Sequence, residues 1–187
     1  MKKLLQKLKR INTNSLVAGS AIFISTCALF LSIQEVRIMR TQQKATMYPY
    51  VTIGWTYNSE GFGVELTNSG NGLAKINSYK VFNDSIYFRE WYDVIKVYMP
   101  EAKNIDYSLV ETAGNIRDQM IAPGESKKLI FLKWTDETRI LEKRIQERMK
   151  VLISYSSLLN EHWLIEDRIP IEIDANYQIS IEEEFGF

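Results

Sequence analysis

The first residues to test for chemistry are His162, the one histidine of the chain, and the nearby acidic residues Glu161, Glu166 and Asp167. An imidazole beside a carboxylate is the arrangement that general acid-base catalysis uses. In a strand, however, neighbouring side chains point to opposite faces, so Glu161 and His162 would not meet. We therefore interpret His162 as a structural residue.

Other catalytic and cofactor chemistries also lack the residues they need. The one cysteine, Cys27, lies within an apolar run, and no histidines, cysteines and acids have the spacing of a metal site. The stretch Asn68-Ser69-Gly70-Asn71-Gly72 lacks the Gly-Lys-Ser/Thr ending of a phosphate loop, so we predict a turn in which glycine supplies positive φ. We expect no catalytic activity, no metal and no cofactor.

Two features could instead carry interactions. Small residues recur three and four positions apart along one face of a predicted helix, where a second helix could approach closely. They are Ala18, Ala21, Ser25, Ala28 and Ser32. The second feature is the pair Leu158 and Leu159 at a predicted hairpin tip, where turns are normally polar. This pair either contacts a protein partner or folds back on the domain.

The small-residue face belongs to an uncharged run, residues 15–33, that follows the basic segment MKKLLQKLKR. As a helix rising about 1.5 Å per residue, the run would cover about 28 Å, close to the hydrocarbon thickness of a bilayer. A signal peptide has a shorter apolar region and a small-x-small cleavage site, whereas Gln34, Glu35, Val36 and Arg37 follow this run. We predict an uncleaved single-pass anchor in a bacterial inner membrane.

Basic residues on the two flanks of the run predict its orientation. Five lie before it and three after it, namely Lys2, Lys3, Lys7, Lys9 and Arg10, and then Arg37, Arg40 and Lys44. The positive-inside rule then places the N-terminus in the cytoplasm and the C-terminal domain outside it.

The neutral chain divides into a basic and an acidic part. Residues 1–44 carry eight Lys/Arg and one acid, a net +7, and residues 45–187 carry fifteen Lys/Arg and twenty-two acids, a net −7. Anionic lipid headgroups attract the first part, and nucleic acid is repelled by the second. We interpret a basic cluster in the domain as a solvated helix face. It contains Lys143, Arg144, Arg148 and Lys150.

The elements that would position these residues are mainly short strands. Alternation of apolar residues between turn signals predicts strands at residues 50–57, 62–66, 74–82, 85–88, 119–121, 128–134, 151–155, 163–165, 169–173 and 177–181. Helical spacing predicts two short helices, over 88–99 and 136–149, and Thr135 is the expected N-cap of the second. Residues 101–115 are expected to form a loop.

Short strands with two inserted helices are typical of an immunoglobulin-like sandwich. We therefore predict a mainly β chain with an N-terminal transmembrane helix. Its parts are a basic segment (1–14), the transmembrane helix (15–34), a helical stem (35–48) that ends at Pro49, and an immunoglobulin-like β-sandwich (49–187).

Several turns and core strands carry a resemblance to other chains. They are Tyr48-Pro49-Tyr50, the loop Asn68-x-Gly70-x-Gly72-x-Ala74, the corner Ala122-Pro123-Gly124-Glu125, and Tyr155-Ser156-Ser157 followed by Glu161-x-Trp163. On these residues the chain resembles uncharacterised bacterial single-pass membrane proteins with an immunoglobulin-like domain, although Leu73 stands where a proline is usual. The resemblance implies the fold and the anchoring, and it implies no activity or ligand.

The function we expect is that of a membrane-anchored binding or assembly module. Its expected partners are the bilayer, a protein of unknown identity and a second copy through the helix, with no nucleic acid. The alternative is an effector or accessory subunit with a cytoplasmic sensor domain. Such a subunit would respond to a ligand or partner by clustering its transmembrane helices.

Overall fold

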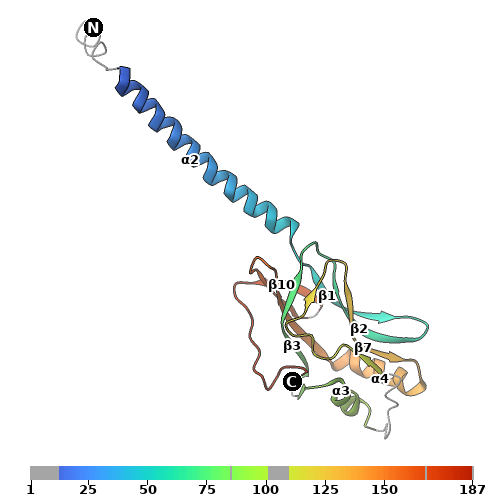
Figure 1. Ribbon diagram of the computed structural model, residues 1–187. Coiled ribbons are helices and arrows are strands. Elements are labelled where there is room, and N and C mark those ends of the chain that lie inside the picture. The colour runs from blue at the N-terminus through green and yellow to red at the C-terminus, as the bar shows by residue number, and fades with distance from the viewer. Residues whose placement is uncertain (1–12, 85, 101–109, 167, 187) are drawn as a thin grey trace. The chain divides into compact units, whose positions relative to one another are not determined.

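The computed structural model describes residues 13–84, 86–100, 110–166 and 168–186 (Figure 1). The chain divides into two compact units, Met1–Ala45 and Thr46–Phe187. The five basic residues before the apolar run lie outside the described residues. So do Ser85, Asp167 and residues 101–109 of the predicted loop.

The described residues of the first unit belong to the helix α2 (Thr13–Thr46), which covers most of the predicted span and stem and extends one residue into the second unit. Its 34 residues correspond to about 51 Å at 1.5 Å per residue, and it is long and apolar enough to cross a membrane. None of its residues is buried. Pro49 lies two residues after Met47, just beyond the end of α2. A proline disfavours helical geometry in the residue before it, which accounts for the end of the helix here.

Hydroxyl groups within α2 are satisfied by the helix itself. The Ser25 hydroxyl donates to the carbonyl of Ala21 at 2.8 Å, and the Thr26 hydroxyl donates to the carbonyl of Ile22 at 2.9 Å. In an apolar medium these bonds remove the cost of unpaired polar groups.

The described residues of the second unit form two antiparallel sheets and two short helices. Sheet A has the strand order β1-β2-β7-β5. Its strands are β1 (Val51–Tyr57), β2 (Gly61–Asn68), β5 (Val110–Thr112) and β7 (Ser126–Lys133). Sheet B has the order β10-β9-β8-β3-β4, and β6 also pairs with β3. Its strands are β3 (Ala74–Asn83), β4 (Ile86–Phe88), β6 (Met120–Ile121), β8 (Lys150–Ser156), β9 (His162–Glu166) and β10 (Ile169–Ile173).

Apolar side chains of both sheets form one core, to which Leu66 of β2, Ile76 of β3 and Ile165 of β9 contribute without any exposed surface. The central strand β8 is covered on both faces. Its Ile153 and Tyr155 belong to the core, whereas the intervening Ser154 is buried by the tail that follows β10.

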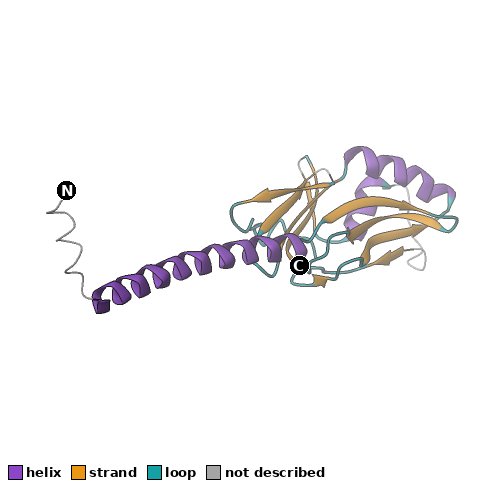
Figure 2. Ribbon diagram, turned by 90° about the horizontal axis from the view of Figure 1, so that it is seen from above, coloured by secondary structure: helices purple, strands orange, loops and turns teal. Residues whose placement is uncertain are grey.

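The two inserted helices are α3 (Trp91–Tyr98) and α4 (Asp136–Arg148), close to their predicted positions. Thr135 is the N-cap of α4, as predicted, because its hydroxyl accepts a hydrogen bond from the backbone N–H of Thr138 at 3.1 Å. Figures 1 and 2 show α3 and α4 together at one end of the strands.

About 34% of the described residues are helical and 36% lie in strands. The chain is therefore mixed helix and sheet, and the prediction of a mainly β chain holds only in part. The difference comes from α2, which contributes most of the helical residues.

Three local predictions were wrong. Residues 177–181 form no strand, because the carbonyl of Tyr177 accepts hydrogen bonds from the side chains of Ser154 and Ser78, at 3.1 and 3.3 Å, on the face of sheet B. Residues 110–112, within the predicted loop, form the edge strand β5. Gly70 and Gly72 do not have positive φ. They are required because a Cβ at either position would overlap the backbone of residues 47–50.

Candidate functional site

The hairpin between β8 and β9 presents the two leucines that the sequence singled out. The Ser157 hydroxyl accepts hydrogen bonds from the backbone N–H groups of Leu159 and Glu161, at 3.1 and 3.2 Å. The Ser157 N–H donates to the Glu161 carbonyl at 2.9 Å, and Asn160 has φ of 61°. Leu158 is 53% exposed, whereas Leu159 is 38% exposed and so is more than half covered by the domain.

This hairpin shares one end of the domain with the residues that follow α2. The Tyr48 ring makes an edge contact with the Trp163 ring, at 5.4 Å between centroids, and Trp163 stacks on Tyr155 at 5.2 Å. We call this end, formed by residues 47–50, 69–73 and 157–161, the stem end. The Leu158-Leu159 hairpin, which we call the leucine tip, is therefore joined by ring contacts to residues 47–50 within the domain.

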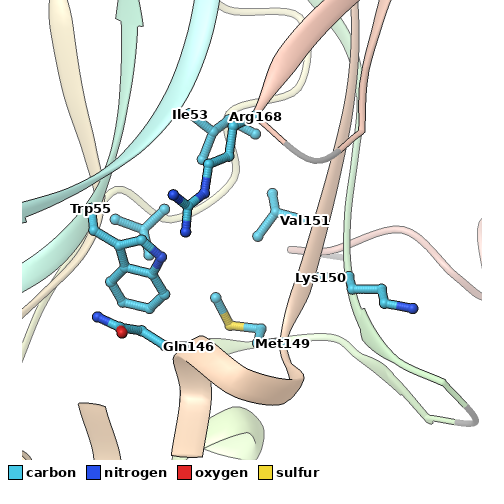
Figure 3. A pocket seen from close by; sticks show the side chains of 8 residues that line it. Ile53, Trp55, Gln146, Met149, Lys150, Val151 and Arg168 are labelled. Atoms are coloured by element: carbon cyan, nitrogen blue, oxygen red, sulfur yellow. The ribbon is translucent and has the colours of Figure 1, made fainter. Parts of the chain in front are cut away.

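A pocket of about 150 Å³ opens at the other end of the strands (Figure 3). Ile53 and Trp55 of β1 form one wall, and Met149 and Val151 form another where α4 leads into β8. These walls are apolar, and polar groups come from Gln146 of α4 and from Arg168. Segments far apart in the sequence thus build one small site.

Arg168 supplies the positive charge of this pocket. It lies in the two-residue connection between β9 and β10 with φ of 81°, a value that favours glycine. Figure 3 shows its guanidinium reaching toward Trp55. Among the described residues, no carboxylate forms a salt bridge with Arg168.

The other polar side chains of the pocket are already engaged. The Gln146 amide donates to the hydroxyl of Tyr57 and, at 3.3 Å, to the carboxylate of Glu142. Burial, followed by the Glu142 carboxylate, raises the pKa of Tyr57, while the Arg168 charge acts in the opposite direction. Lys150 points away from the pocket in Figure 3 and pairs with Asp84 at 3.0 Å. The Arg168 guanidinium is thus the cation that faces the pocket.

Sequence reasoning missed this site. One signal was available, because Asp167-Arg168 stands between two strand-like runs and predicts a two-residue hairpin. Such a hairpin usually carries glycine at a position with positive φ, and this dipeptide contains none. Neither the neighbouring Trp55 nor the pocket itself can be read from that signal.

The acid-base pair considered at His162 is not assembled. His162 is half-buried at the start of β9, and its Nδ1 has no hydrogen-bond partner among the described residues. The Glu161 carboxylate instead accepts a hydrogen bond from the Ser157 hydroxyl at 3.3 Å. Within the described parts of the chain, no three histidine, cysteine or acidic residues lie close enough to hold a metal ion.

The small residues predicted to form a helix seam all lie in α2 and are exposed there. They are Ala18, Ala21, Ser25, Ala28 and Ser32. Because the Ser25 hydroxyl is bonded to the Ala21 carbonyl, it does not project from this face as a free polar group. Cys27 is exposed on the same helix.

The basic cluster on and after α4 has partly structural partners. Arg144 donates to the carbonyl of Tyr98 at 2.8 Å, which ties α4 to α3, and Lys150 pairs with Asp84. Lys143 and Arg148 are exposed. The cluster therefore does not form one continuous anion-binding surface.

Comparison with known proteins gives one result. The model of a family described as a domain of unknown function, DUF8453, matches residues 13–177. No curated protein and no solved structure matches the chain.

Proposed function

This chain belongs to the DUF8453 family, and from that premise we propose that it is a single-pass membrane-anchored binding or assembly module without catalytic activity. The observation that carries the proposal is the exposed Leu158-Leu159 tip, held on a fixed turn at the stem end. Hydrogen bonds of the turn restrict its backbone, which lowers the conformational entropy lost on binding, so the tip suits recognition of a partner.

The order of the strands supports an immunoglobulin-like sandwich as the scaffold of this module. In constant-type immunoglobulin domains the sheets have the orders A-B-E-D and C-F-G. Strands β1, β2, β7 and β5 follow the first order, and β3, β8 and β9 follow the second. In this interpretation β6 and β10 are additions, and α3 and α4 are insertions between strands.

The leucine tip is the proposed contact with a protein partner that resides in the same membrane. Because residue 47 directly follows α2, the stem end is the part of the domain that the chain joins directly to the proposed membrane helix. Copurification of the full chain from crosslinked membranes tests this contact. We expect the double variant Leu158→Ser/Leu159→Ser to lose partner proteins that the wild type retains.

The matched control is Ile169→Ser/Ile171→Ser, which removes two exposed isoleucines of β10 instead. Partners should remain with this control. An unchanged set of partners with the leucine variant would refute the role of the tip.

We propose that the domain lies outside the cytoplasm, supported by the five basic residues before the apolar run against three after it. A C-terminal fusion to a reporter that is active only outside the cytoplasm should show activity. Activity of a cytoplasm-only reporter at the same position would reverse this orientation.

The second candidate is an effector or accessory subunit that senses a partner in the cytoplasm and acts by clustering its helices. The small-residue face of α2 favours it, because small side chains let two helices approach closely in a bilayer. The reporter fusions separate the two candidates, since they require opposite sides of the membrane.

A further inference from the structure

We propose that the pocket at Arg168 binds a small organic anion, whose carboxylate pairs with the guanidinium and whose short apolar body packs against Trp55. The inference deepens the proposed binding function and rests on it. It assigns that function a second site, at the end of the domain opposite the leucine tip.

The backbone at Arg168 gives the first argument. A φ of 81° is strained for a residue with a Cβ, and glycine would adopt it freely. Strained backbone outside glycine is concentrated at functional sites, where the side chain is needed despite its cost. At Arg168 the strained connection directs a guanidinium into the pocket (Figure 3).

The charges around the pocket give the second argument. Among the described residues no carboxylate pairs with Arg168, while Lys150 is paired with Asp84 and Gln146 is bonded to Tyr57 and Glu142. The guanidinium therefore has hydrogen-bond donors to offer a ligand. Its planar fork matches a carboxylate with two parallel hydrogen bonds.

The walls and size of the pocket define the rest of the ligand. Ile53 is buried, and Trp55, Met149 and Val151 are half-buried, so only part of these apolar side chains is open to a ligand, beside a polar lining. The volume of about 150 Å³ is smaller than the roughly 300 Å³ at which sites for drug-sized ligands begin. A single small aromatic or aliphatic acid fits this description.

A purely structural role for Arg168 makes a different prediction. Arg168 lies near the C-terminal end of α4, where a cation can stabilise the helix dipole. If that were its purpose, replacing Arg168 would lower stability. If ligand binding is its purpose, Arg168→Gly should relieve the backbone, so that stability stays equal or rises, while binding is lost.

Calorimetric titration of the full chain in lipid nanodiscs tests the proposal with phenylacetate as the probe. We expect saturable binding of phenylacetate and at least about tenfold weaker binding of phenylacetamide, its neutral analogue, because a charge-assisted hydrogen-bond pair is lost. Arg168→Gly and Arg168→Gln should each weaken phenylacetate binding by at least about tenfold. The Gln variant keeps a Cβ and an uncharged polar side chain, two atoms shorter than arginine, if Arg168→Gly disturbs the turn.

The matched control is Asn160→Gly, which also places glycine at a positive φ, in the β8–β9 turn of the stem end. It should bind phenylacetate as the wild type does. Equal binding by wild type and Arg168→Gln, equal binding of acid and amide, or no saturable binding of phenylacetate would each overturn the proposal. Inorganic phosphate binding as tightly as phenylacetate would overturn the assignment to a carboxylate.

The two sites fail separately. The Leu158→Ser/Leu159→Ser variant should still bind phenylacetate, because its changes lie at the other end of the domain. No saturable binding of phenylacetate by the wild type, together with partner loss in the leucine variant, refutes only the Arg168 inference. Saturable phenylacetate binding that depends on Arg168, together with unchanged partners in the leucine variant, refutes only the leucine contact.

Discussion

At the scale of single residues, Asn68 joins the stem end into one unit. It has no exposed surface, and its Oδ1 accepts hydrogen bonds from the N–H groups of Tyr50 and Gly70, at 3.2 and 3.1 Å. Its Nδ2 donates to the carbonyls of Gly72 and Ile121, at 2.8 and 3.0 Å. One amide thus connects the residues after α2, the loop after β2 and strand β6.

We expect Asn68→Ala to lower the free energy of unfolding by about 3 kcal/mol, because it leaves several backbone groups without their partners. Asn71→Ala is the control, since Asn71 lies in the same loop with an exposed side chain. Urea denaturation of the full chain in detergent measures both. Similar losses for the two variants would show that the Asn68 amide is not the connecting group.

Glu184 gives the domain a defined pH dependence. Its side chain is 1% exposed and pairs with Arg117 at 2.5 Å. Burial raises the pKa of Glu184 above its ordinary value, against the lowering effect of Arg117. Between the ordinary pKa of 4.5 and the raised folded value, the folded state binds more protons than the unfolded state. Stability contributed by this group therefore increases as pH falls through that window.

Comparison of the wild type with Glu184→Gln isolates this effect, because the amide does not titrate. The free energy of unfolding of the wild type, minus that of the variant, should increase as pH falls from 7 and level off below 4.5. Denaturation at a series of pH values measures the difference. A difference that stays constant with pH, or decreases on acidification, would contradict the raised pKa.

At the scale of elements, the sequence was most informative where one face of an element is buried. The alternation in β1 and β3 and the Thr135 cap of α4 all report local physics, and the structure confirms these elements. Strand β5 was missed because its three residues lie at the edge of sheet A and only Val110 is half-buried, which leaves no alternation to detect.

The two candidate sites also differ in how far local sequence could predict them. The sequence identified the leucine tip, because apolar residues in a turn are a local anomaly. The Arg168 pocket could not be predicted, because tertiary packing brings together Ile53 of β1, Gln146 of α4 and the β9–β10 connection. Similarly, the need for glycine at Gly72 comes from the nearby backbone of Met47, and no local turn rule contains that information.

The small-residue face of α2 makes a prediction that belongs to this scale. If two copies associate through it, Ala21→Leu/Ala28→Leu should weaken self-association by at least about tenfold, because the larger side chains keep the helices apart. Cys27→Leu is the control, since Cys27 lies on another face of the helix. Mass measurement across a dilution series in detergent detects the change. A wild type that is monomeric at every concentration would remove the seam.

At the scale of the whole domain, the tail after β10 connects parts that lie far apart in the sequence. The N–H of Phe185 donates to the carbonyl of Tyr79 at 2.8 Å, and the N–H of Gly186 donates to the carbonyl of Arg89 at 2.7 Å. The Phe185 ring is 2% exposed and contacts the rings of Tyr79 and Trp91, at 4.9 and 5.1 Å between centroids. The tail thus joins sheet B to α3.

Because Phe185 belongs to the same core as both sheets, we expect Phe185→Ala to destabilise the domain as one cooperative unit. The free energy of unfolding should fall by about 3 to 5 kcal/mol, the usual cost of removing a buried phenylalanine. Ile181→Ala tests the same tail at a residue that is 67% exposed, and its effect should stay within about 0.5 kcal/mol.

Near-ultraviolet circular dichroism and tryptophan fluorescence during denaturation measure both variants in the full chain. Coincident transitions, shifted only for Phe185→Ala, are expected if the tail is part of the cooperative core. If Phe185→Ala lost a local signal while the main transition stayed in place, the tail would be a separate segment that the two sheets do not need for their stability. The proposed partner contact at the leucine tip and the pocket at Arg168 would then not depend on the tail.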